Sequence, residues 1–237
     1  MNPHRIIIVP GWRNSGPDHW QSLWAQQLPH AERVEQDDWL VPHREPWVAA
    51  LEQLVLSRPE PVVLAAHSLG CITAAHMGPE ASARVQGALL VAPADPERRA
   101  QLADFAPVPY APLPYRSVLV ASSNDPYCPI RRAGAYARAW GSEFVRLQNA
   151  GHINVESGFG DWPLGLALLQ SLMQGDSWQP AQPRPAVRAP RVAGARAAVP
   201  AGAGAPGPPG CEVAAGEDGG SGFLYGSRPL TNKNIFF

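Results

Sequence analysis

Cysteine is scarce in this sequence, and its three copies lie far apart. Cys71, Cys128 and Cys211 form no C-x-x-C pair, and their number is odd. Disulfide frameworks use even sets of cysteines, and cysteine metal sites need further ligands at close spacing. We therefore expect neither a disulfide framework nor a bound metal.

An excess of charge and long apolar runs are also lacking. The formal net charge is −1 and the sequence pI is about 6.7, which points to no nucleic-acid or anionic membrane partner. No apolar run approaches the length of a membrane span, and the start MNPHRIIIVPGW holds only the apolar run IIIV before a proline. That run is too short for a signal peptide. We expect a cytoplasmic protein, with no pattern that fixes its oligomeric state.

The composition changes near residue 174. Eleven glycines and nine prolines fall within 175–237, and Lys233 in this stretch is the only lysine of a chain that has eighteen arginines. Such a stretch buries too little apolar surface to order itself. The sequence therefore predicts a folded domain at residues 1–174 and a disordered tail at 175–237.

Within the predicted domain, short continuous apolar runs alternate with helical stretches. Strands are expected at 5–10, 61–68, 85–93, 116–123 and 142–147, with a weaker one at 32–36; helices are expected at 18–29, 46–57, 69–78, 130–140 and 162–174. Runs without polar alternation are typical of parallel strands buried on both faces. The alternation predicts a three-layer α/β fold with a mostly parallel central sheet of about six strands.

The stretch 95–116 is too small for a large cap domain. It is rich in proline and aromatic residues after a short helical start. It either overhangs the carboxyl ends of the strands or forms an extended surface connector.

Ser68 is the candidate nucleophile. It follows an apolar strand and precedes a helix, within A-H-S-L-G at 66–70. A strand–turn–helix elbow of this kind needs small residues two positions before and after the serine, here Ala66 and Gly70. Serine is also a favoured helix N-cap, so the pentapeptide alone does not decide between a cap and a nucleophile.

A serine nucleophile needs a base and an orienting carboxylate. His152, in a loop after the last predicted strand, suits the base. Asp125 and Asp95 each follow a strand end. We favour Asp125, because one helix and one strand then lead to His152, whereas Asp95 suits a turn that caps a helix. The resulting order Ser, Asp, His is that of α/β hydrolases.

Backbone N–H groups are the expected oxyanion donors. One belongs to Leu69, which follows the nucleophile, and the other to Trp12 in the loop after the first strand. Gly11 lets that loop approach the site closely. His67 adjoins Ser68 and is expected to line the pocket or pack beneath it.

Five motifs together resemble the family of small serine hydrolases that includes retinoblastoma-binding protein 9 and the YdeN-type proteins. They are PGWRNSGPDHWQSLW (10–24), DDWLVPHREPWVAAL (37–51), AAHSLGC (65–71), SSNDPYCP (122–129) and NAGHIN (149–154). The resemblance covers residues 3–174. It implies a compact α/β-hydrolase domain without a large cap, a triad of Ser68, Asp125 and His152, and no cofactor. It settles the choice of Asp125 over Asp95.

The sequence accordingly predicts a serine hydrolase, carboxylesterase-like, that cleaves a small carboxylic ester, thioester or amide through an acyl-enzyme. The motif tryptophans either wall an acyl pocket or pack in the core; among them Trp39 is expected to contact substrate, together with Gly11 and His67. The alternative is a binding protein that keeps the hydrolase fold without turnover.

Overall fold

A single sheet organises the computed structural model, which describes residues 4–174 and 235–236. The strand order is β2-β1-β3-β4-β5-β6-β7. The strands are β1 Arg5–Val9, β2 Ala31–Arg33, β3 Val62–His67, β4 Val85–Val91, β5 Arg116–Ser122, β6 Glu143–Leu147 and β7 Ile235–Phe236. The first six pair in parallel, which confirms the predicted sheet.

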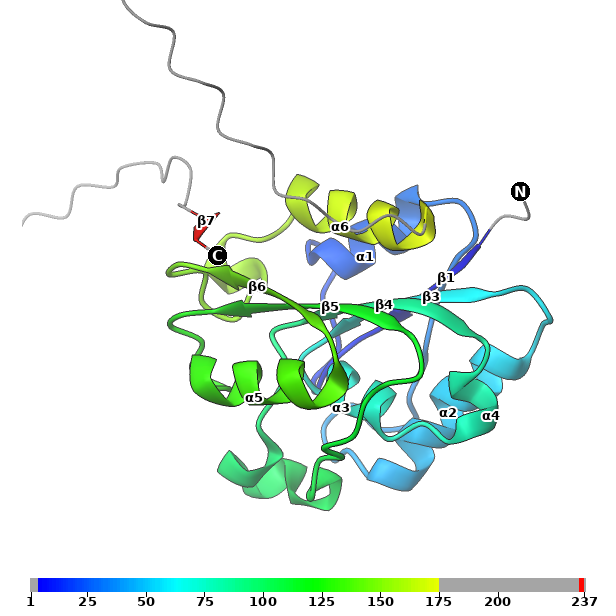
Figure 1. Ribbon diagram of the computed structural model, residues 1–237, viewed down its shortest axis with the longest axis horizontal. Coiled ribbons are helices and arrows are strands. Elements are labelled where there is room, and N and C mark those ends of the chain that lie inside the picture. Colours follow the sequence, from blue (N-terminus) through cyan, green and yellow to red (C-terminus); the bar gives the residue numbers. More distant parts are fainter. Residues whose placement is uncertain (1–3, 175–234, 237) are drawn as a thin grey trace, which may run out of the picture. The chain divides into compact units, whose positions relative to one another are not determined.

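Helices cover both faces of this sheet. Helices α1 and α6 lie on one face, and α2, α3, α4 and α5 lie on the other (Figure 1). The α-helices are α1 Trp20–Gln27, α2 Arg44–Leu56, α3 Leu69–Ala75, α4 Pro79–Ser82, α5 Ile130–Trp140 and α6 Pro163–Gln174; the 3-10 helices are η1 Pro96–Arg98, η2 Ala100–Phe105 and η3 Val155–Ser157. The predicted three-layer α/β architecture is confirmed. Among residues 4–174, no helix combines the length and apolarity needed to cross a membrane.

Each face of the sheet has its own apolar core. In β1, Ile6 and Ile8 belong to the cluster on the side of α1 and α6, whereas Ile7 and Val9 belong to the cluster on the side of α2, α3 and α5. Because side chains alternate between the faces of a strand, a strand covered on both sides must be apolar throughout. This explains the continuous runs in the sequence.

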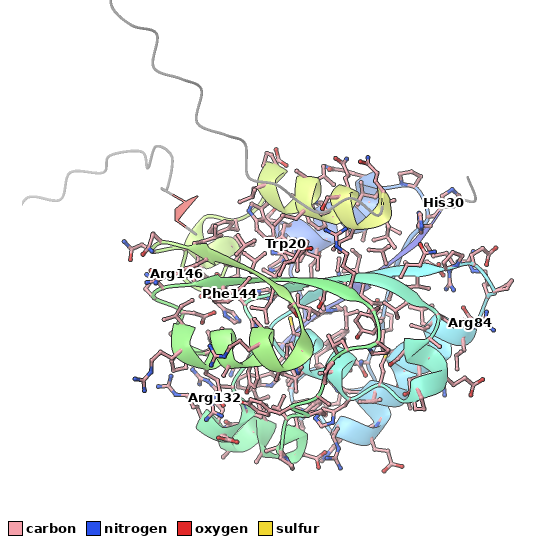
Figure 2. All side chains as sticks on the ribbon, in the orientation of Figure 1. Trp20, His30, Arg84, Arg132, Phe144 and Arg146 are labelled. Atoms are coloured by element: carbon pink, nitrogen blue, oxygen red, sulfur yellow. The ribbon has the colours of Figure 1, made fainter. Side chains whose placement is uncertain are left out.

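Trp20 of α1 connects the core to the carboxyl end of the sheet. Its buried ring lies between the sheet and the layer of α1 and α6 (Figure 2). Its Nε1–H donates a 3.0 Å hydrogen bond to the carbonyl of Ile153, in the loop after β6. Thus α1 fixes a loop that will carry part of the site.

Proline explains two of the helix boundaries that differ from the sequence expectation. The helix predicted at 69–78 ends at Ala75, and Gly78, in extended conformation, precedes the new helix α4 that begins at Pro79. Proline disfavours helical backbone in the residue before it and suits the first turn of a new helix. Likewise α2 begins at Arg44, ahead of the predicted start at residue 46, because Pro46 is tolerated in a first turn.

The connector between β4 and β5 contains only the short helices η1 and η2. Within residues 4–174 this connector therefore forms no large cap domain, as expected. Leu102 of η2 reaches the cavity around Ser68. Of the two alternatives for this stretch, the structure supports the overhanging one.

Most of the predicted tail lies outside the described residues. Only Ile235 and Phe236 of residues 175–237 are described, and they pair antiparallel with Leu147 and Arg146 of β6. The proposed boundary at residue 174 and the predicted disorder of the tail stay predictions.

Candidate active site

Ser68 occupies a sharp turn between β3 and α3. Its backbone has φ 55° and ψ −120°, a conformation that side-chain-bearing residues rarely adopt. The Ser68 N–H donates to the carbonyl of Val91 at 3.0 Å, which ties the turn to the end of β4. Strained backbone that the surrounding structure holds in place is concentrated at functional sites. The turn presents the hydroxyl at the carboxyl end of the sheet.

Position 70 requires a residue without a side chain, because α3 starts directly against the end of β1. A Cβ atom built on Gly70 would lie 2.3 Å from the carbonyl oxygen of Val9 and 2.7 Å from that of Pro10. Both neighbours are backbone atoms and cannot move aside without moving the strand. Ala66, two residues before Ser68, is fully buried. The small residues expected around a serine elbow thus have a packing reason here.

The structure brings Ser68, His152 and Asp125 into one hydrogen-bonded chain. His152 Nε2 lies 3.0 Å from Ser68 Oγ, and Nδ1 lies 3.0 Å and 2.9 Å from the two carboxylate oxygens of Asp125. An ionised carboxylate only accepts, so Nδ1 carries the proton and Nε2 is left to accept from the hydroxyl. The three residues are only 7–9% exposed, so few water molecules can compete for these hydrogen bonds.

Asp95, the alternative acid, has its ion-pair contact with Arg132 and not with His152. Its side chain is 2% exposed, and Oδ2 lies 3.3 Å from Nε of Arg132 in α5. His152 instead has its ion-pair contact with Asp125, at 2.9 Å. The carboxylate on the imidazole is that of Asp125.

Three hydrogen bonds join the loop that carries Asp125 to the loop that carries His152. Side-chain oxygens at the end of β5 and in the loop after it accept from backbone N–H groups of the second loop: Ser123 Oγ from Asn149 at 2.9 Å, Ser122 Oγ from Ala150 at 2.9 Å, and Asn124 Oδ1 from Gly151 at 2.8 Å. Sequence reasoning missed these three acceptors. The run Ser-Ser-Asn directly before Asp125 was the available signal, because such side chains often bond to loop backbone.

Gly11 lies against the nucleophile on the side of β1. A Cβ built on Gly11 would lie 2.7 Å from Ser68 Cβ and 3.2 Å from the backbone nitrogen of Leu69. The next residue, Trp12, lines the cavity, and its indole Nε1–H donates to the carbonyl of Leu40 at 2.9 Å. The residues expected to supply oxyanion donors therefore flank Ser68.

The cavity around Ser68 measures about 200 Å³. It is lined by Trp12, Arg13, Asn14, His19, His67, Ser68, Leu102, Tyr127, His152, Asn154 and Glu156. Trp39, which was expected to contact substrate, is not among these residues. Its ring packs on Trp47 with centroids 5.5 Å apart, and its carbonyl accepts from the N–H of Arg13. In the structure Trp39 supports the loop that borders the cavity.

Tyr127 is a site residue to which the sequence analysis assigned no role. Its ring centroid lies 4.3 Å from that of His152, and its N–H donates to Asp125 Oδ1 at 2.8 Å. The tyrosine therefore contacts both members of the imidazole–carboxylate pair. The signal was its position shortly after Asp125, inside the motif NDPYCP.

Two further histidines line the cavity beside His152. His67 Nε2–H donates to the carbonyl of His152 at 2.9 Å, and the His19 ring lies 4.9 Å from that of His67. Burial lowers the pKa of His67 well below its usual value, with a further contribution from His152. Burial likewise lowers the pKa of His19, to about 4, helped by the charges of His152 and Arg33. Both rings are therefore neutral near pH 7.

The low pKa of His19 predicts a loss of stability in mild acid. The unfolded chain binds a proton near pH 6.5, whereas folded His19, only 5% exposed, resists it down to about pH 4. The contribution of neutral His19 to the free energy of unfolding is thus complete above pH 6.5. It falls by about 3 kcal/mol at most as the pH drops from 6.5 to 4. His19→Asn keeps an acceptor for the N–H of Gln21 at the start of α1 but cannot titrate.

Urea unfolding at several values between pH 7.5 and 4 measures this effect. We expect the difference in unfolding free energy between the variant and the native chain to shift in favour of the variant as the pH falls. Burial, the main cause of the low pKa of His67, is common to both proteins, so the difference between them reports His19 together with its coupling to His67. If the free energy of unfolding changed with pH in the same way in both proteins, His19 would not be the cause of the loss of stability in acid.

Comparisons with known proteins agree with this fold. The model of a family described as serine hydrolase matches residues 6–171. A solved structure described as a YdeN-like hydrolase from Pectobacterium atrosepticum is 36% identical, with a TM-score of 0.64, over 71% of this chain and 91% of that one.

More distant structures share the fold. The ydeN gene product of Bacillus subtilis is 21% identical over 73% of this chain and 100% of that one, with a TM-score of 0.61. Est1E from Butyrivibrio proteoclasticus is 12% identical over 73% of this chain and 88% of that one, with a TM-score of 0.52. No curated protein matches the chain.

Proposed function

This chain belongs to the serine hydrolase family, and on that premise we propose that it hydrolyses a small carboxylic ester, thioester or amide through an acyl-enzyme on Ser68. The observation that carries the proposal is the chain of hydrogen bonds from Ser68 Oγ through the His152 ring to Asp125. A serine hydroxyl becomes an effective nucleophile when a base is placed within hydrogen-bond reach and that base is itself oriented. Carboxylic esters are the substrates we favour.

In the first half-reaction Ser68 Oγ attacks the substrate carbonyl carbon while His152 Nε2 takes the hydroxyl proton. The carbonyl oxygen becomes an oxyanion, and Asp125 stabilises the imidazolium that has formed. His152 then gives its proton to the leaving alcohol, thiol or amine as the bond from carbon to the leaving group breaks. The acyl group remains as an ester of Ser68.

In the second half-reaction water replaces the leaving group. His152 takes a proton from the water as its oxygen bonds to the acyl carbon, and returns a proton to Ser68 Oγ as the acid departs. The backbone N–H groups of Leu69 and Trp12 are the proposed oxyanion donors. The position of Gly11 against Ser68 and the Leu69 nitrogen supports this, because a side chain there would occupy the space beside the donor. Protein groups and water suffice for every step of this chemistry.

A series of p-nitrophenyl esters from acetate to octanoate tests this function. We expect turnover of the short esters and a decline in kcat/KM toward octanoate, because a cavity of about 200 Å³ has little room for a long acyl chain. A fluorophosphonate probe should label the protein at Ser68, as located by peptide mass spectrometry. A folded protein that turns over no ester and resists the probe would instead favour a binding protein with a hydrolase fold.

A further inference from the structure

Two arginines stack on aromatic rings that line the cavity around Ser68. The guanidinium carbon of Arg13 lies 4.5 Å from the ring centroid of Trp12, and that of Arg99 lies 4.4 Å from the ring centroid of Tyr127. Trp12 follows β1, and Tyr127 follows β5. Because β1 lies on one side of β3 in the sheet and β5 lies on the other, the two arginines flank the serine from opposite sides.

Both aromatic rings are fixed by other contacts. The Trp12 indole donates to the carbonyl of Leu40, and the Tyr127 ring packs on His152. Arg13 itself has a backbone φ of 69°, held by its N–H bond to the carbonyl of Trp39. A guanidinium stacked on a ring face keeps the N–H donors at its edge available. The arginines are thus positioned in advance to receive an anion.

The charges around the cavity are not balanced. Neither Arg13 nor Arg99 has an ion-pair partner among residues 4–174. The lining histidines His19 and His67 are neutral near pH 7, and Asp125 is paired with His152. Within the described part of the chain, Glu156 is the one acidic residue that lines the cavity, and it is exposed. Of the two arginines, Arg13 lines the cavity together with Glu156, and Arg99 lies against the lining residue Tyr127.

A second concavity beyond η1 adds to the positive charge. It measures about 620 Å³, and its lining includes Arg98, Arg131, Arg132 and Arg138. As far as the structure describes the chain, only Arg132 among these is ion-paired, with Asp95 and Glu97. Arg98 adjoins Arg99 in the chain, so the positive field continues from the site onto this surface.

We propose that the substrate is a small anionic ester or thioester, with a carboxylate that Arg13 or Arg99 binds at the cavity mouth. The inference rests on the proposed function and names its substrate class. Guanidinium groups bind carboxylates through paired, charge-assisted hydrogen bonds. The anion belongs either to the acyl part or to the leaving group, and the position of one arginine on each side of Ser68 accommodates both cases.

Matched substrate pairs test the proposal. Monomethyl succinate against methyl succinamate places the charge in the acyl part, and 4-acetoxybenzoate against 4-acetoxybenzamide places it in the leaving group. Each kcat/KM is divided by the rate constant of alkaline hydrolysis to remove intrinsic reactivity. In at least one pair, we expect the anionic member to be preferred by about tenfold, as for one charge-assisted hydrogen bond. The preference should weaken in 0.5 M NaCl.

Variants that remove one charge test which residues cause the preference for the anionic substrate. Arg13→Gln or Arg99→Gln should reduce the anionic-to-neutral ratio about tenfold, and Glu156→Gln should raise it. Arg84→Gln is the matched control. Arg84 is an exposed arginine directly before β4, at the amino ends of the strands, and Figure 2 shows it on the opposite side of the view from Arg132. Its replacement should leave the ratio unchanged.

The outcomes separate this inference from the function. A ratio of one or less in both pairs, or a ratio that Arg84→Gln lowers as much as Arg13→Gln and Arg99→Gln do, overturns the anionic substrate. The anionic substrate is also overturned if neither anionic ester is hydrolysed while Ser68 still hydrolyses p-nitrophenyl acetate. In that case the proposed function stands. Loss of all ester turnover removes the proposed function, and the inference with it.

Discussion

Ser68→Ala is expected to lower kcat for short p-nitrophenyl esters by about 10⁶, down to the level set by binding and oxyanion donors alone. The substitution removes one oxygen, which is the atom that His152 Nε2 contacts at 3.0 Å. Without it no acyl-enzyme forms, and His152 can only assist direct attack by water. The fluorophosphonate label should disappear together with the activity.

The fold should survive this change. Ala and Ser both bear a Cβ, so the strain at φ 55° is similar for the two residues. Ser82→Ala is a matched control, because Ser82 is also buried but lies in α4, before the amino end of β4. That variant should keep its activity. More than about one hundredth of the native kcat in Ser68→Ala would contradict a serine nucleophile.

Much of the fold follows from the hydrophobic pattern because the sheet is covered on both faces. Runs such as Ile6–Val9 leave no polar face, and β3, β4 and β5 are similarly buried. The pattern is weaker where burial is one-sided. β2, which lies at the edge of the sheet, was expected at 32–36 and is found at Ala31–Arg33, all half-buried. Helix α4 was missed because a single turn has no recognisable period.

The site was predictable where the chemistry depends on one residue and its position after a strand. Ser68, Asp125 and His152 each follow the carboxyl end of a parallel strand, and such ends meet at one edge of the sheet. Contacts that depend on loop geometry were not predictable. Tyr127 reaches His152, and Trp39 turns toward Trp47, because of local backbone paths that periodicity does not encode.

His19 has two roles in the structure. Its position directly before α1 suits a polar residue that begins the helix, and its Nδ1 accepts from the N–H of Gln21 at 3.2 Å. The same ring also lines the cavity and packs on His67. This second contact joins the start of α1 to the end of β3, segments that lie far apart in the sequence, so only the folded chain reveals it.

Asp125→Asn is expected to lower kcat by about 10⁴ with little change in the position of the imidazole. Both carboxylate oxygens of Asp125 lie within 3.0 Å of His152 Nδ1 and fix the proton there. An amide nitrogen in the same place donates to Nδ1 and drives the proton onto Nε2. The imidazole then faces Ser68 with a donor and cannot take the hydroxyl proton.

Asp95→Asn is the matched control, since it removes the charge of the other acid that the sequence offered. Asp95 contacts Arg132 of α5, so its replacement should weaken the anchoring of that helix and lower stability while kcat changes less than about tenfold. Kinetics at pH 8 and urea unfolding of both variants separate the two roles. A larger loss of kcat in Asp95→Asn than in Asp125→Asn would assign the orienting carboxylate to Asp95, against the 2.9 Å contact between His152 and Asp125.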